Sequence, residues 1–92
     1  MRTAIQTPNI SSQMAGEFQI RYKTAYVLRN MRAKKHITQQ RIASDAGIYA
    51  QSYNKYERAM HTPSLHLLFS FAKTLGVRPS EIIKQIEDTN LN

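Results

Sequence analysis

Apolar side chains recur along most of this chain with the period of an α-helix, about 3.6 residues. The first stretch with this pattern runs from about Glu17 to Lys35 and predicts one long helix. Its stripe of mainly apolar positions consists of Ile20, Thr24, Val27, Leu28 and Met31. Residues 1–16 are polar, contain Pro8 and show no sustained period, so we expect them to form a flexible arm.

Residues 39–58 show the same period twice, which predicts two short helices joined by a turn. The apolar or small positions are Ile42, Ala43, Ala46, Ile48, Tyr53 and Tyr56. Gly47 lies between the helices and can take positive φ without steric cost, so the second helix can leave at a steep angle. We expect Thr38 to cap the first helix, and the second to run from about residue 50 to residue 57 or 58. This is a helix-turn-helix, a motif whose second helix lies in the major groove of DNA.

Two more helices are predicted in the last third of the chain. Pro63 suits the first turn of a fourth helix, with Thr62 as its candidate cap, and Gly76 suits its end. Ser80 is the expected cap of a short fifth helix. The inner side of this fifth helix is expected to carry Ile82, Ile83 and Ile86.

The length of 92 residues and the hydrophobic content of 41% suffice for one domain with a modest core. No repeat or linker divides the chain. We therefore expect an all-α, compact five-helix domain at residues 17–87, preceded by the arm at residues 1–16 and followed by a frayed tail at residues 88–92.

The charge balance points to a polyanionic partner. Thirteen Lys and Arg residues oppose six Asp and Glu residues, which gives a formal net charge of +7. Nucleic acid is the first partner that this implies, and an anionic membrane surface is the second. No acidic residue occurs between residues 18 and 44. The basic residues of that stretch are Arg21, Lys23, Arg29, Arg32, Lys34, Lys35 and Arg41.

Several classes of site and protein are not expected. The sequence has no cysteine, which excludes disulfides and Cys-ligated zinc. His36, His61 and His66 lack i, i+4 spacing and clustered carboxylates, so no metal site is expected. No paired acids, Ser–His arrangement, P-loop or glycine fingerprint indicates an enzyme or a cofactor. No apolar run approaches the roughly 20 residues that span a bilayer. The first residues lack the apolar core of a secretory signal, which favours a cytoplasmic location.

From Leu28 to Ile83 the chain resembles the lambda-repressor/Cro (xenobiotic-response-element, XRE) family of helix-turn-helix regulators. The resemblance rests on the ordered set Thr38-Gln39, Ala43, Gly47-Ile48, Tyr56-Glu57-Arg58, Pro63-Ser64-Leu65 and Leu75-Gly76-Val77. It implies a lambda-repressor-like fold and binding to double-stranded DNA.

The resemblance also implies roles for single residues. Gln39 matches a position that bonds a DNA phosphate and braces the recognition helix. The positions that face base edges or the adjacent backbone correspond to Tyr49, Ala50, Gln51, Ser52 and Lys55. The apolar pattern supports this placement, because inward-pointing tyrosines at 53 and 56 leave Gln51, Ser52 and Lys55 on the outer face. A glutamine there can pair with adenine N6 and N7, and a lysine can donate to guanine O6 and N7.

Other polar residues of the motif are assigned to the DNA backbone or to the structure. The remaining candidate phosphate ligands are Arg32, Lys34, Lys35, Arg41, Asn54 and Arg58. Glu57 is expected to serve the structure by bonding to a basic residue or a backbone amide.

The sequence departs from the family pattern at five positions. Tyr49 stands where Ser or Thr usually caps the recognition helix, so this helix is expected to begin one residue later. His36 and Ala59 stand where glycine often ends a helix, which implies strain or altered helix ends. Tyr53 and Tyr56 replace aliphatic core residues. Their rings are expected inside with the hydroxyls at the edge, one of them near a phosphate.

We expect a transcriptional regulator, in the first instance a repressor, that binds a pseudo-palindromic operator as a homodimer. Dimer contacts are expected from the fifth helix and tail, at Ile83, Ile86 and Leu91, with Tyr22 and Tyr26 of the first helix as the second candidate. A toxin or RNA polymerase is the expected kind of protein partner. Two alternatives stay open, namely an antitoxin-type protein that neutralises a toxin, and a protein-interaction or RNA-binding module on the same fold.

Overall fold

A computed structural model describes residues 10–90, and this part of the chain is all-α. Its helices are α1 (Ile10–Lys34), α2 (Gln39–Asp45), α3 (Ala50–Glu57), α4 (Leu65–Leu75) and α5 (Pro79–Asp88). The predicted five-helix fold is therefore confirmed. The beginning of the predicted arm and Leu91 lie outside the described residues. None of the described helices combines the length and the apolar character that crossing a bilayer requires.

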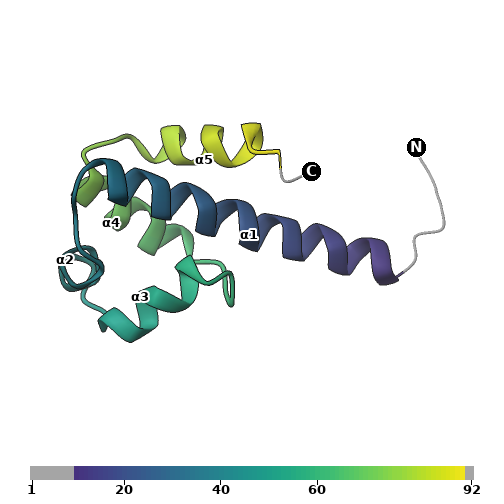
Figure 1. Ribbon diagram of the computed structural model, residues 1–92, viewed down its shortest axis with the longest axis horizontal. Helices are drawn as coiled ribbons and strands as arrows, with labels where there is room; N and C mark the ends of the chain where they lie inside the picture. The colour runs from purple at the N-terminus through teal and green to yellow at the C-terminus, as the bar shows by residue number, and fades with distance from the viewer. Residues whose placement is uncertain (1–9, 91–92) are drawn as a thin grey trace.

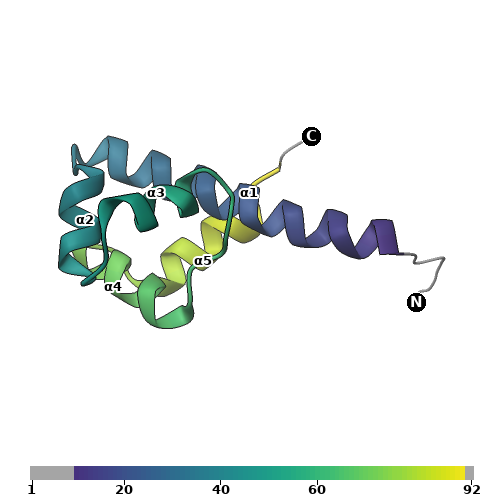
Figure 2. The ribbon, with the colours of Figure 1, turned by 90° about the horizontal axis from the view of Figure 1, so that it is seen from below.

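The long helix α1 is the element on which the others assemble. It packs against α3 and α5, while α2 packs against α3 and α4, and α4 against α5. In Figure 1, α5 runs along one side of α1 and α3 lies on the other side. Figures 1 and 2 both show the N-terminal part of α1 extending beyond the other helices, in keeping with principal extents of 44 × 23 × 23 Å.

The core draws on every described helix. Its buried members are Val27, Leu28, Met31, Ile42, Ala43, Tyr53, Leu68, Phe71, Ala72, Leu75 and Ile82. Phe71 is fully buried. The ring of Tyr53 meets it edge-on, with centroids 5.1 Å apart, and the ring of Tyr56 lies 6.1 Å from it. Full burial of a large side chain stabilises by roughly 1.5–3 kcal/mol, so this aromatic cluster is a major part of what holds α3 against α4.

The structure corrects three predicted helix starts. Helix α1 begins at Ile10 and not at about Glu17, because extending a helix that has already nucleated costs little per residue. Helix α4 is capped by Ser64 and not by Thr62, since the Ser64 hydroxyl accepts a hydrogen bond of 3.1 Å from the Leu67 amide. Helix α5 begins at Pro79, two residues before the start that a Ser80 cap implies. The fixed φ of proline suits the first helical position.

Three further predictions, two about helix surfaces and one about a helix end, were wrong. Ile20 is 54% exposed and lies outside the core, because α1 projects past its neighbours there. Ile83 is 43% exposed, so Ile82 and the half-buried Ile86 alone form the inner side of α5. Asp88, predicted to lie in the frayed tail, is the last residue of α5, and its carboxylate pairs with Lys84 at 3.2 Å.

The unusual turn residues adopt the conformation that their positions demand. Gly47 and Gly76 have φ of 73° and 72°, and His36 and Ala59 have φ of 56° and 60°. The last two are the positions where the sequence lacks the usual glycine, so the predicted departure is confirmed. A side chain in this left-handed region costs roughly 1–2 kcal/mol.

We expect His36→Gly to stabilise the protein by about 0.5 kcal/mol. The imidazole of His36 is exposed, so its removal loses little packing. Relief of strain at φ 56° should outweigh the roughly 0.4–1 kcal/mol by which glycine stabilises the unfolded chain. Urea unfolding at pH 7 measures the change. The matched control is Gly76→Ala, whose new methyl would meet nothing within 4 Å. The control should destabilise by about 1 kcal/mol through φ alone. Destabilisation by His36→Gly would contradict this account.

Candidate nucleic-acid interface

The segment from α2 to α3 has the geometry of a helix-turn-helix. The Thr38 hydroxyl caps α2 by accepting a hydrogen bond of 3.0 Å from the Arg41 amide, as predicted. Gly47 then reverses the chain, and the Ile48 amide donates to the Ala43 carbonyl at 3.0 Å, which closes the turn. Tyr49 is the N-cap of α3 but forms no side-chain cap bond. Because Tyr49 keeps the N-cap position and α3 begins at Ala50, the expectation that this helix begins one residue later is wrong.

Helix α3 presents one inner and one outer face. Tyr53 and Glu57 are buried at 0% and 3% exposure, which places them on the inner face. Gln51, Ser52 and Lys55 are exposed together on the outer face. Tyr49, just before the helix, is 79% exposed, the highest value among the exposed large hydrophobic residues in the described part of the chain.

A shallow hollow runs along the outer side of α3 and brings one residue of α2 to it. It is lined by Gln39, Ala50, Gln51, Asn54, Lys55 and Arg58. The structure therefore gathers most of the predicted base-reading residues on one surface, together with three of the predicted phosphate ligands.

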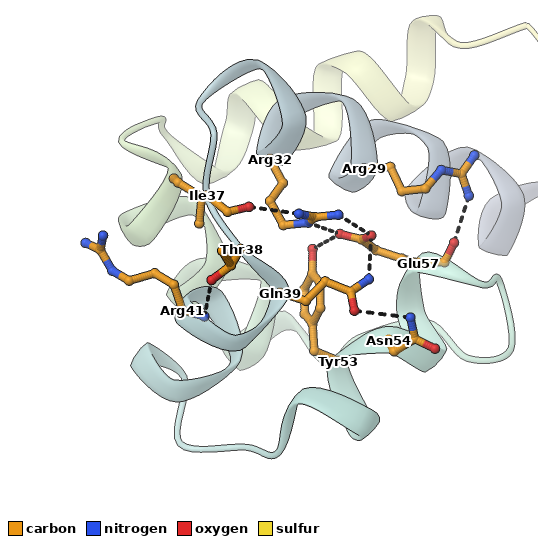
Figure 3. Close-up of polar contacts among 9 residues, drawn as sticks. All are labelled: Arg29, Arg32, Ile37, Thr38, Gln39, Arg41, Tyr53, Asn54 and Glu57. Carbon is orange, nitrogen blue, oxygen red and sulfur yellow. Dashed lines mark hydrogen bonds and ion pairs between the residues drawn. The ribbon is translucent and has the colours of Figure 1, made fainter.

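The buried carboxylate of Glu57 is the centre of a polar network that joins α1, α2 and α3 (Figure 3). Arg32 donates from Nε to Oε2 at 2.6 Å and from Nη2 to Oε1 at 3.0 Å. The Tyr53 hydroxyl donates to Oε2 at 2.5 Å, and Gln39 donates from Nε2 to Oε1 at 2.9 Å. Four donors thus satisfy a charge that would be costly to bury alone.

The network shifts the pKa of its members in a consistent direction. Burial by itself raises the pKa of Glu57, but the hydrogen bonds from Arg32, Tyr53 and Gln39 outweigh it, and the net shift is downward. Burial first, and then the bond to Glu57, raises the pKa of Tyr53. The hydrogen bond to Glu57 raises the pKa of Arg32. Near neutral pH the site therefore contains a carboxylate, a guanidinium and a neutral phenol.

The network changes the roles expected of two residues. Arg32 was predicted to bind phosphate, but its side chain is only 20% exposed, and it also donates to the Ile37 carbonyl at 2.8 Å. We therefore assign it to the structure. Tyr53 was predicted to hold its hydroxyl at the edge, whereas this hydroxyl is buried against Glu57. The sequence signal for this contact is the spacing, because Tyr53 and Glu57 stand at i and i+4 on one helix face.

Gln39 and Asn54 form a second layer in front of the carboxylate. Asn54 donates from Nδ2 to Gln39 Oε1 at 3.2 Å, so Gln39 connects the outer side of α3 to Glu57. A carboxamide has two N–H donors, and the bond to Glu57 uses one of them. The predicted bracing position of Gln39 is thus matched by two hydrogen bonds within the protein.

The other predicted phosphate ligands do not gather at α3. Lys34 and Lys35 line a hollow between the end of α1 and the start of α5, beside Arg78 and Glu81. Arg41 lies next to α4 and pairs with Asp45 at 3.3 Å, while remaining 63% exposed. Arg58 is exposed directly after α3. Among the described residues, no group of three or more His, Asp or Glu side chains is placed to hold a metal.

Comparisons with known proteins agree with this geometry. Residues 28–82 match the family described as Helix-turn-helix. Two crystal structures of the clp gene regulator ClgR from Corynebacterium glutamicum are similar in fold, each with a TM-score of 0.71 and 23% sequence identity. One match covers 75% of this chain and 73% of the other, and the second covers 79% and 96%. No curated protein sequence matches the chain.

The Glu57 network predicts a defined dependence of stability on pH. We expect Glu57→Gln to lower the free energy of unfolding at pH 7 by about 3 kcal/mol, because it leaves Arg32 without its ion pair. The pKa of Glu57 is lower in the folded state than its unfolded value of about 4.3. Its contribution is therefore complete above about pH 5 and is lost as the pH falls through the folded pKa. The difference between the variant and the wild type should narrow as the pH falls below the unfolded pKa and Glu57 of the wild type becomes protonated.

Urea unfolding between pH 7 and pH 2 tests this expectation. The matched control is Glu81→Gln at an exposed position of α5, which should change stability by less than about 0.5 kcal/mol. A difference that is constant with pH would mean that the ionised carboxylate of Glu57 contributes nothing.

Proposed function

The chain belongs to the helix-turn-helix family of the lambda-repressor/Cro (XRE) type, a family of DNA-binding transcription regulators, and we propose that it represses transcription as a homodimer on a pseudo-palindromic operator. The observation that carries the proposal is the outer face of α3. Gln51, Ser52 and Lys55 lie there side by side and exposed, while Glu57 anchors the opposite face. A helix so held can present its polar edge to the major groove.

Each exposed residue has a defined chemistry toward DNA. Gln51 suits the N6 and N7 edge of adenine, and Lys55 suits O6 and N7 of guanine. Ala50 and the exposed ring of Tyr49 offer apolar contact to a thymine methyl group. Ser52 can bond to any base edge.

Phosphates complete the proposed contact. Arg58 and Asn54 flank the reading face, and Gln39 has an N–H donor left after its bond to Glu57. Arg41, Lys34 and Lys35 are exposed further away, where they add to the attraction for the DNA backbone. Repression is the simplest outcome for such a protein, since occupation of a promoter excludes RNA polymerase without any specific contact to it.

Selection of bound fragments from random duplex DNA, followed by footprinting, tests the proposal. It should enrich two inverted half-sites about one helical turn apart, roughly 10 base pairs. For the selected duplex, Gln51→Ala and Lys55→Ala should each weaken binding by about 5- to 150-fold, which corresponds to roughly 1–3 kcal/mol for one base contact. Each should also relax the preference at one position of the half-site.

The matched controls remove the same side chains elsewhere. Gln19→Ala on α1 and Lys73→Ala on α4 change exposed residues away from α3 and should leave the preference unchanged. If Gln51→Ala and Lys55→Ala bind like these controls, α3 does not read DNA. That outcome would favour an interaction module on the same fold.

The proposed dimer uses α5, on the side of α1 away from α3 in Figure 1. Ile83 is 43% exposed and Ile86 is half-buried beside it; Leu91 is the proposed third contact. We expect Ile83→Asp to weaken self-association by at least tenfold, roughly 1.4 kcal/mol, because a charge would be buried in the interface. Sedimentation equilibrium measures this. Leu65→Asp, at a residue of α4 that is 66% exposed, is the control that should leave the dimer intact. A wild type that is monomeric with and without DNA would overturn the dimer.

A further inference from the structure

The carboxyl end of α3 is held by arginines of α1 that the reading of DNA does not use. An α-helix leaves its last four carbonyls without partners inside the helix. In α3 the carbonyls of residues 54, 55 and 56 accept from the amides of Arg58, Met60 and Ala59 at 3.0, 2.9 and 3.2 Å. The fourth carbonyl, that of Glu57, accepts from Nη1 of Arg29 at 2.8 Å. Arg29 is therefore the side chain that completes the end of the recognition helix (Figure 3).

A second arginine of α1 holds the turn that follows. Arg21 donates from Nη1 to the Met60 carbonyl at 3.2 Å. Arg21, Ala25 and Arg29 are spaced by four residues and so share one face of α1. Ala25 between them is buried at 1% exposure. The turn that these arginines hold contains Ala59 at a positive φ of 60°, so it is a strained segment fixed from outside.

We propose that Arg29, assisted by Arg21, is a positioning residue, which fixes the tilt of α3 against α1 and thereby the sequence preference of the protein. The inference rests on the proposed function, because it assigns a role in base reading to residues that contact no base. Arg32 attaches α1 to α3 through the side chain of Glu57. Arg29 provides a second attachment, through the main chain of α3.

The geometry shows why a main-chain attachment matters for reading. Helix α3 has eight residues, so it is about 12 Å long. A tilt of about 10° around one end moves the other end by about 2 Å. Contacts to base edges tolerate displacements of only about 0.5 Å. Contacts to phosphates by long flexible side chains tolerate more. Loss of the Arg29 bond should therefore reduce specific binding far more than non-specific binding.

The test compares Arg29→Met with the wild type on two DNA ligands at one salt concentration. Methionine retains a long unbranched stem but removes the donor and the charge. The ligands are the duplex selected by the wild type and a random duplex of equal length. Lys23→Met, on the same helix, is the control for loss of one positive charge. We expect Arg29→Met to weaken binding to the selected duplex about tenfold and to the random duplex about twofold. Lys23→Met should weaken both about twofold.

Arg29→Lys, which keeps a donor, should recover most of the specificity ratio. A thermal unfolding curve for each variant ensures that every measurement refers to folded protein. Equal losses on both ligands would identify Arg29 as a phosphate ligand and overturn the proposal, as would behaviour identical to that of Lys23→Met. If the wild type itself does not discriminate between the ligands, the proposed function fails, and the inference fails with it. If the wild type discriminates and Arg29→Met keeps the ratio, the inference alone fails.

Discussion

The structure depends on one buried negative charge. Glu57 is 3% exposed, and its carboxylate is surrounded by donors from three helices, namely Arg32 of α1, Gln39 of α2 and Tyr53 of α3. An unpaired carboxylate in this place would be strongly destabilising, so the three helices are held in a single relative arrangement. A hydrophobic residue could fill the same space, but apolar contacts do not depend on direction. The carboxylate specifies an orientation, and orientation is what the proposed reading of base edges by α3 requires.

Helix α3 could not supply that orientation itself. Its eight residues are fewer than the roughly 12–15 that an isolated helix needs for marginal stability, and its N-cap, Tyr49, forms no side-chain cap bond. Its conformation is therefore imposed by tertiary contacts. The ring of Tyr53 packs on Phe71, the Tyr53 hydroxyl and Glu57 join the polar network, and Arg29 holds the last carbonyl. Every one of these contacts leaves the outer face of the helix free.

Local signals in the sequence account for the features that could be predicted. The apolar period locates the helices, Gly47 and Gly76 mark two turns, and the side-chain order around Tyr53 separates the inner face of α3 from the outer one. Helix starts were less predictable, because Thr62, Ser64 and Ser80 look alike as candidate caps, whereas only Ser64 of these three is an N-cap in the structure. Glu57 was expected to bond to a basic residue or a backbone amide, but Arg32 could not be identified as its partner. Glu57 is 25 residues away in sequence, and nothing local distinguishes Arg32 from the other basic residues of α1.

The basic stretch shows how composition can mislead about contacts with DNA. Seven basic residues fall between residues 18 and 44 without an acidic neighbour, and as a set they suggest a phosphate-binding surface. Three of them, Arg21, Arg29 and Arg32, donate instead to carbonyls or to the carboxylate at the end of α3. Their forked donors can bridge two elements, which a lysine ammonium does less well. The lysines of the stretch stand at exposed or half-buried positions. These three arginines of α1 thus build the scaffold that orients α3, and the number of positive charges sets only an upper bound on the number of phosphates that the domain can bind.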